Sequence, residues 1–145
     1  MTLLELIIAC TILLILSSAA LPIARYSIIY QKEALLHYDL RQIRDAIDRY
    51  KDAADLHLFQ TELGSENYPP DLETLTKPIT LAGGGDRKIR FLRRIPVDPM
   101  TGQADWGLRA VQDDPDSTSW GGKNVFDVYS KSQATATDGK RYADW

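Results

Sequence analysis

Few residues of this chain have the chemistry of a catalytic or metal site, and their spacing keeps them apart. The two histidines, His37 and His57, fall on one predicted helix, where 20 positions correspond to about 30 Å along the axis. The single cysteine, Cys10, has no partner for a disulfide or a metal site, and we interpret it as a small apolar residue of a packed helix. No serine, histidine and aspartate set and no paired-carboxylate pattern is visible in the sequence. We therefore predict that the protein is not an enzyme.

Glu5 is the ionisable residue with the most unusual position. It stands near the start of an apolar stretch, residues 3–24, and a bilayer-spanning helix needs roughly 20 such residues. An ionisable group in hydrocarbon costs roughly 2.5–3.5 kcal/mol on insertion scales, so a desolvated carboxylate must be paired or protonated. The free N-terminal amine is the expected partner, from the same chain or from a neighbouring copy offset along the axis. Pairing with a neighbour would couple the neutralisation of Glu5 to assembly.

Three interpretations of this apolar stretch compete. A secretory signal peptide would carry Lys or Arg before it, and residues 1–5 contain neither. A plain membrane anchor would leave Glu5 without a partner. The third interpretation is that Glu5 has a dedicated partner, the N-terminal amine of its own chain or of a neighbouring copy, and we favour it. Pro22 removes one helical hydrogen bond and predicts a break or kink near the end of the stretch.

From residue 25 the pattern becomes that of an amphipathic helix, with apolar residues at steps of three or four and charges of both signs on the other face. Because no Gly or Pro occurs in residues 23–63, we expect one continuous helix of about 55 residues and about 80 Å. A chain of this size cannot cover so long a helix, so its first half must project into lipid or against other subunits. The apolar positions are Leu36, Leu40, Ile43, Ile47, Tyr50, Ala54 and Leu58.

The remaining residues predict a small globular domain. Gly64 is expected to end the long helix, and Asp71 to begin a short helix that reaches Leu75. Two β-rich stretches, residues 106–111 and 125–129, predict an antiparallel pair packed against the long helix. The expected fold class is α+β. Its parts are the apolar helical half (residues 1–24), the amphipathic half (residues 25–63) and a small domain with a C-terminal β-hairpin (residues 64–145).

The net charge of −3 gives no electrostatic case for nucleic-acid binding, but two local clusters stand out. In a helical assembly every subunit presents both clusters, so we consider Arg93 and Arg94 of one copy as contacts for Asp113 and Asp114 of the next. Two independently solvated loops are the alternative. The clusters are the basic residues Arg87, Lys88, Arg90, Arg93 and Arg94 and the acidic residues Asp113, Asp114 and Asp116.

The tetrad Thr2-Leu3-Leu4-Glu5 before a long apolar run resembles the mature start of type IV pilin-like proteins. In that family a prepilin peptidase removes a short basic leader, and the new first residue, usually Phe, is N-methylated. The resemblance implies that Met1 is the processed and methylated residue, which we expect because no basic leader precedes it. It also implies that Glu5 acts in assembly and that the helix unwinds locally near Pro22 in the filament.

The later motifs are most similar to those of the major pseudopilin of type II secretion systems. This chain has Met100-Thr101-Gly102 where the family carries Trp-Gly. The family binds calcium in the loop after the second strand, where this chain offers only Asp138 and Asp144 as carboxylate ligands. Calcium prefers six to eight oxygens, so we expect no cofactor, with those two aspartates as the candidate calcium ligands. The similar motifs are Tyr68-Pro69, Ile95-Pro96-Val97-Asp98-Pro99, Val125 to Ser130, and the closing Asp138-Gly139 with Tyr142 and Trp145.

The resemblance implies a structural subunit of a helical filament for protein secretion, held in the bacterial inner membrane before assembly and then in a periplasmic or extracellular filament. The implied partners are copies of itself, minor pseudopilins, the inner-membrane assembly machinery and the prepilin peptidase. A type IV pilin for adhesion, motility or DNA uptake is the alternative, and the later motifs and the lack of a C-terminal disulfide pair favour the pseudopilin. A third hypothesis is an electron-conducting fibre, in which only assembly could bring the helical rings together. Those rings are Tyr26, Tyr30, Tyr38, Tyr50 and Phe59.

Overall fold

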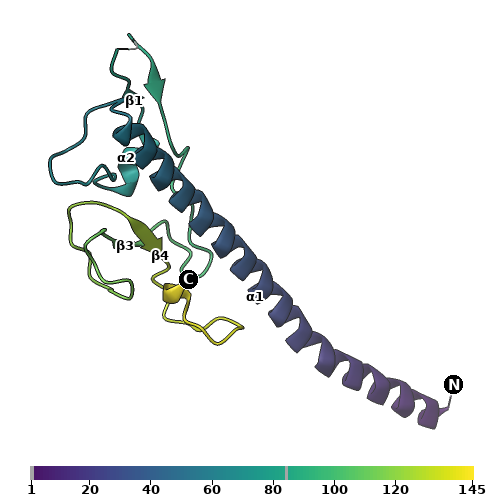
Figure 1. The fold of residues 1–145 in the computed structure, drawn as a ribbon. Helices are drawn as coiled ribbons and strands as arrows, with labels where there is room; N and C mark the ends of the chain where they lie inside the picture. Colours follow the sequence, from purple (N-terminus) through teal and green to yellow (C-terminus); the bar gives the residue numbers. More distant parts are fainter. Residues whose placement is uncertain (1, 84) are drawn as a thin grey trace.

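The computed structural model describes residues 2–83 and 85–145, except for the side chain of Leu21. Its largest element is α1, Leu3–Asp55, a helix of 53 residues whose N-terminal half projects from a small lobe (Figure 1). At 1.5 Å per residue this helix is about 80 Å long. The prediction of one long helix followed by a small α+β region is confirmed.

The start of α1 is capped by Thr2, whose side-chain oxygen accepts a hydrogen bond from the backbone N–H of Glu5 at 3.3 Å. Such a cap satisfies one of the four N–H groups that a helix leaves unpaired at its start. The helix then runs through Pro22 without interruption. The break near Pro22 that we expect in the assembled filament is absent from the single chain and stays a prediction for the filament.

The expected end of α1 at residue 63 is wrong, because the helix ends at Asp55. The N–H of His57 bonds the carbonyl of Ala54 and the N–H of Leu58 bonds the carbonyl of Ala53, while His57 takes a left-handed φ of 54°. This is the Schellman ending, which usually places glycine where this chain has His57. Phe59 then turns back, so that its ring lies 4.9 Å from that of Tyr50.

The remaining elements are short, and three of them, a helix and two strands, were predicted. Helix α2, Leu72–Thr76, is capped by Asp71, whose carboxylate accepts the N–H of Thr74 at 2.6 Å. Strands β3, Gly107–Arg109, and β4, Asp127–Tyr129, pair antiparallel, shorter than the predicted stretches. Strand β4 contacts α1, and β3 lies on its outer side. A second antiparallel pair was not predicted, and it is formed by β1, Ile79–Thr80, and β2, Lys88–Ile89. Near the end of the chain a 3₁₀ turn, η1, covers Tyr142–Asp144.

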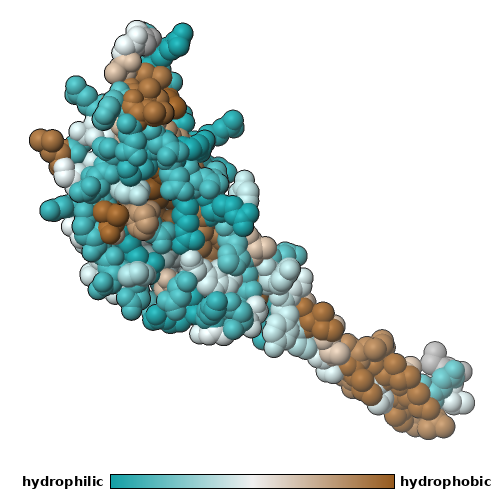
Figure 2. Space-filling model, in the orientation of Figure 1, coloured by the Kyte–Doolittle hydropathy of each residue, from teal (hydrophilic) through white to brown (hydrophobic). Residues whose placement is uncertain are grey.

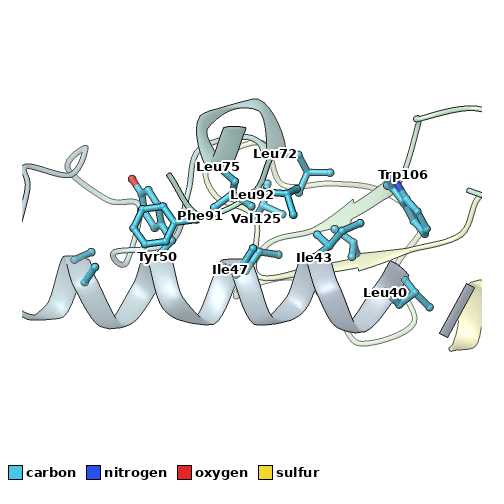
Figure 3. Packing of buried hydrophobic residues seen from close by; sticks show 14 of the residues in the cluster. Leu40, Ile43, Ile47, Tyr50, Leu72, Leu75, Phe91, Leu92, Trp106 and Val125 are labelled. Atoms are coloured by element: carbon cyan, nitrogen blue, oxygen red, sulfur yellow. The ribbon is translucent and has the colours of Figure 1, made fainter. Parts of the chain in front are cut away.

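The core lies against the second half of α1, where Ile43 and Ile47 point toward Leu72, Leu75 and Val125 (Figure 3). Burial confirms the predicted apolar face from Leu36 to Ala54, whereas Leu58, beyond the end of the helix, remains 37% exposed. Tyr50, Phe59 and Phe91 form an aromatic cluster at one end of the core. The expectation that only assembly brings the helical rings together is therefore wrong for Tyr50 and Phe59, whose buried rings already lie 4.9 Å apart within one subunit because the chain turns back after α1.

Candidate assembly surface

The first half of α1 has no covering within the chain. Every described side chain from residue 2 to residue 32 is exposed. Figure 2 shows this half as a largely hydrophobic rod that leaves a mainly hydrophilic lobe. By length and composition the helix is compatible with a membrane span. An apolar surface of this extent needs lipid or protein around it.

Glu5 lies in the first turn of this exposed half. Its backbone N–H is held by the Thr2 hydroxyl, and its side chain is solvent-exposed. A carboxylate in the first turn is favoured by the helix dipole. The sequence analysis missed the Thr2 cap, whose observed bond comes from the backbone N–H of Glu5 and not from its carboxylate. Met1, the predicted processing and methylation site and the source of the amine, lies outside the described residues. Cys10 is exposed on the same half, not packed within the subunit.

Of the side chains predicted to make charge contacts between copies, three have no ion-pair partner among the described residues and one is hydrogen-bonded within its own loop. Arg93, Arg94 and Asp114 are exposed, and in residues 2–83 and 85–145 none of them takes part in an ion pair. The carboxylate of Asp113 instead accepts the N–H groups of Ala110 at 2.7 Å and Gly121 at 3.0 Å. These two hydrogen bonds hold the pKa of Asp113 below its ordinary value. Asp113 therefore fixes its own loop and is a poor candidate for a contact with a neighbour.

The candidate calcium ligands serve their own turns. Asp138 accepts the N–H of Lys140 at 2.9 Å, and Asp144 receives two hydrogen bonds from Arg141, at 3.0 and 2.8 Å. Within the described part of the chain, no group of three or more His, Cys, Asp or Glu side chains lies close enough together to hold a metal ion. Both carboxylates therefore make their observed hydrogen bonds within their own turns.

Glu33 is a buried charged residue that the sequence analysis missed. The residue is 6% exposed, and its carboxylate accepts hydrogen bonds from the N–H of Thr137 at 2.8 Å, the Thr137 hydroxyl at 2.7 Å and the Tyr142 hydroxyl at 3.0 Å. Burial and the Glu33 carboxylate raise the pKa of Tyr142 to about 12, so this hydroxyl stays protonated as a donor. The burial of Glu33 could have been predicted from its position, because it precedes Leu36 and Leu40 at helical spacing and so lies on the same face of α1.

Two further contacts fasten the C-terminal tail to α1. The ring of His37 stacks on Trp145, with centroids 4.0 Å apart and planes 6° from parallel. Arg44 donates to the Trp145 carbonyl at 2.8 Å and pairs with Asp127 of β4 at 2.7 Å. Together with Glu33, these residues hold the tail at the level where the lobe gives way to the exposed half of α1.

The Glu33 contacts predict a pH-dependent stability. Burial alone would raise the pKa of Glu33, but the hydrogen bonds from Thr137 and Tyr142 outweigh it and hold that pKa below its usual 4.5. A carboxylate with a lowered folded-state pKa stabilises the fold above its unfolded pKa, and this contribution disappears as pH falls through the folded value. We expect Glu33→Gln to cost about 1–3 kcal/mol at neutral pH and to flatten the loss of stability below about pH 4.5.

Thermal unfolding of the full chain in detergent between pH 3 and 7 measures this difference. Glu73→Gln, at an exposed position on α2, is the matched control and should follow the wild-type profile. Wild type and Glu33→Gln with parallel profiles would show that Glu33 does not titrate with folding.

Comparisons with protein-family models, curated proteins and solved structures gave no significant match to this chain. The function is therefore inferred from its own residues, their geometry and the motifs of its sequence.

Proposed function

We propose that this chain is the structural subunit of a helical type IV pilus-like filament, and that it is the major pseudopilin of a type II protein secretion system. The observation that carries the proposal is the division of α1. Residues 36–54 form one wall of the lobe's core, whereas residues 2–32 are exposed wherever the side chain is described. A helix with one half buried in the core of the lobe and the other half exposed suits a subunit that first lies in lipid and then packs against copies of itself.

Glu5 favours assembly over a permanent membrane anchor. A carboxylate within an apolar helix has to be neutralised, and a neighbouring copy displaced along the filament axis brings a cationic N-terminus near it. Because the apolar halves project from one end of the lobe (Figure 1), many copies can gather them in a common centre with the lobes outside. A contact between two different surfaces of the same subunit repeats without closing and gives a filament.

The packing of the lobe supports the pseudopilin over the pilin. The Ile95 to Pro99 motif and the Val125 to Ser130 motif are among the later motifs that resemble the major pseudopilin, and they meet in the structure. Asp98 is fully buried and accepts the Ser130 hydroxyl at 2.6 Å and the N–H of Met100 at 2.8 Å. The two motifs thus form one interior feature, as expected if they specify this type of lobe together.

The resemblance extends the proposal to location and partners. The subunit is held in the bacterial inner membrane and then enters a periplasmic or extracellular filament. Its partners are the prepilin peptidase acting at Met1, the minor pseudopilins, the inner-membrane assembly machinery and further copies of itself. No enzymatic activity and no cofactor form part of the proposal.

Deleting the gene tests the pseudopilin assignment. Folded cargo proteins should accumulate in the periplasm, and surface pili, adhesion and DNA uptake should be unchanged. Complementation with the wild-type chain is the control and should restore secretion. Normal secretion combined with loss of pili would overturn the pseudopilin assignment in favour of a type IV pilin.

A further inference from the structure

A basic groove lies between α1 and the segment around β2. It has a volume of about 600 Å³, and its charged lining consists of Arg49 from α1 with Lys88, Arg90 and Arg93. All four side chains are exposed, and none belongs to an ion pair among the described residues. Arg49 is held in place by donating to the carbonyl of Phe91 at 2.8 Å. The groove thus presents fixed positive charge without an acid in its own lining.

The chain also carries a surface of opposite charge, in the loop that follows β3. With Asp113 bound to backbone N–H groups, Asp114 and Asp116 are left as its exposed carboxylates. A turn in which the N–H of Ser117 bonds the carbonyl of Asp114 at 2.9 Å presents the pair together. Since β4 packs on α1 and β3 lies outside it, this loop is on the side of the lobe away from the helix (Figure 1).

The groove and strand β4 lie at neighbouring levels along α1 but on different sides of it, and the loop leaves β3 beside Asp127 of β4, because Arg109 pairs with Asp127. Arg44 marks the side of β4, because it pairs with Asp127, and Arg49 marks the groove. Five helical residues correspond to about 7.5 Å along the axis and about 140° around it. Neighbouring copies placed side by side can therefore bring the loop of one to the groove of the next, and the same contact repeats along an open helix.

We propose that the groove of Arg49, Lys88, Arg90 and Arg93 binds the loop of Asp114 and Asp116 from a neighbouring copy of this chain. The inference rests on the proposed function, because it requires subunits packed side by side. It changes the contact expected from the sequence in two ways. Asp113 is left out because its carboxylate is bound within its own loop, and Arg49 is added to the basic side. A second copy fits better than a nucleic acid, because the cations form one short groove on an acidic chain and not a continuous track.

A charge swap tests the pairing in filaments of the full-length protein. Lys88→Glu with Arg90→Glu should lower the yield of sheared filaments about tenfold, because like charges then face each other in every repeat. Adding Asp114→Lys and Asp116→Lys to the same chain should restore the yield to within about twofold of wild type. Arg41→Glu with Lys140→Glu changes the net charge by the same amount at exposed positions outside both the groove and the loop after β3, and it should leave the yield unchanged. Thermal unfolding of each variant separates lost contacts from misfolding.

Disulfide cross-linking gives an independent readout. In a Cys10→Ala background, Arg90→Cys with Asp114→Cys should give a ladder of covalent oligomers from oxidised filaments, and Arg90→Cys with Lys140→Cys should not. If the wild-type chain forms filaments but the charge swap gives no rescue and the cysteine pair gives no ladder, this contact is overturned. The filament proposal then still stands. A wild-type chain that forms no filaments would remove both.

Discussion

Replacing Glu5 by alanine is expected to reduce the yield of filaments by about tenfold or more and to leave membrane insertion intact. Glu5 is the single charged residue in the apolar half of α1, and its exposed side chain has no ion-pair partner in the part of the chain that the structure describes. In the proposed filament the carboxylate is paired with the N-terminal amine of a neighbour, so its removal leaves that amine desolvated and uncompensated.

Two control variants separate charge pairing from helix capping. Glu5→Gln keeps the size of the side chain and should fail as alanine does, because it lacks the charge. Thr2→Ala removes the N-cap, at a cost of about 0.5–2 kcal/mol to the helix end, but keeps the carboxylate and should still assemble. Immunoblots of membrane and sheared fractions measure both steps. A normal filament yield from Glu5→Ala would leave Glu5 only its structural place in the first turn.

The largest effect on folding is expected from Ile43→Ala. Ile43 is fully buried in the core, where removing its side-chain atoms leaves a cavity. Such substitutions cost about 2–5 kcal/mol, which should lower the melting temperature of the lobe by about 10 °C or more. Differential scanning calorimetry or circular dichroism of the full chain in detergent measures the shift.

Ile12→Ala is the matched control, because it deletes the same atoms from the bare half of α1, where Ile12 is 52% exposed. It should leave the melting temperature unchanged and lower only filament yield. A similar loss of thermal stability from both variants would contradict the division of α1 into a core half and an assembly half.

The spacing of apolar residues in the sequence predicted the buried face of the long helix correctly. Apolar residues from Leu36 to Ala54 predicted the buried face, because their spacing matches a helix that packs on one side. The end of α1 was missed because a left-handed residue usually signals itself as glycine, and here it is His57. Strands β1 and β2 have two residues each, too few for an alternating pattern to register.

Two features of the fold depend on contacts between segments that are far apart in the sequence, and the sequence did not predict them. The helical pattern predicted the charged residues of the amphipathic half on the face opposite the apolar one, but Glu33 becomes buried because Thr137 and Tyr142 supply its donors. The pairing of β3 with β4 needs glycine at position 107, because a Cβ there would overlap the ring of Tyr129. Neither requirement is visible until segments far apart in the chain are brought together.

Cryo-electron microscopy of purified full-length protein distinguishes a filament subunit from a permanent membrane anchor. We expect helical filaments in which residues 3–24 of α1 lie at the centre, packed against the same segment of neighbouring copies, with the lobes on the outside. We also expect a local opening of the helix near Pro22, in contrast to the unbroken helix of the single chain. Monomers that remain dispersed in detergent or bilayers, without filaments under conditions that support assembly, would contradict the filament proposal.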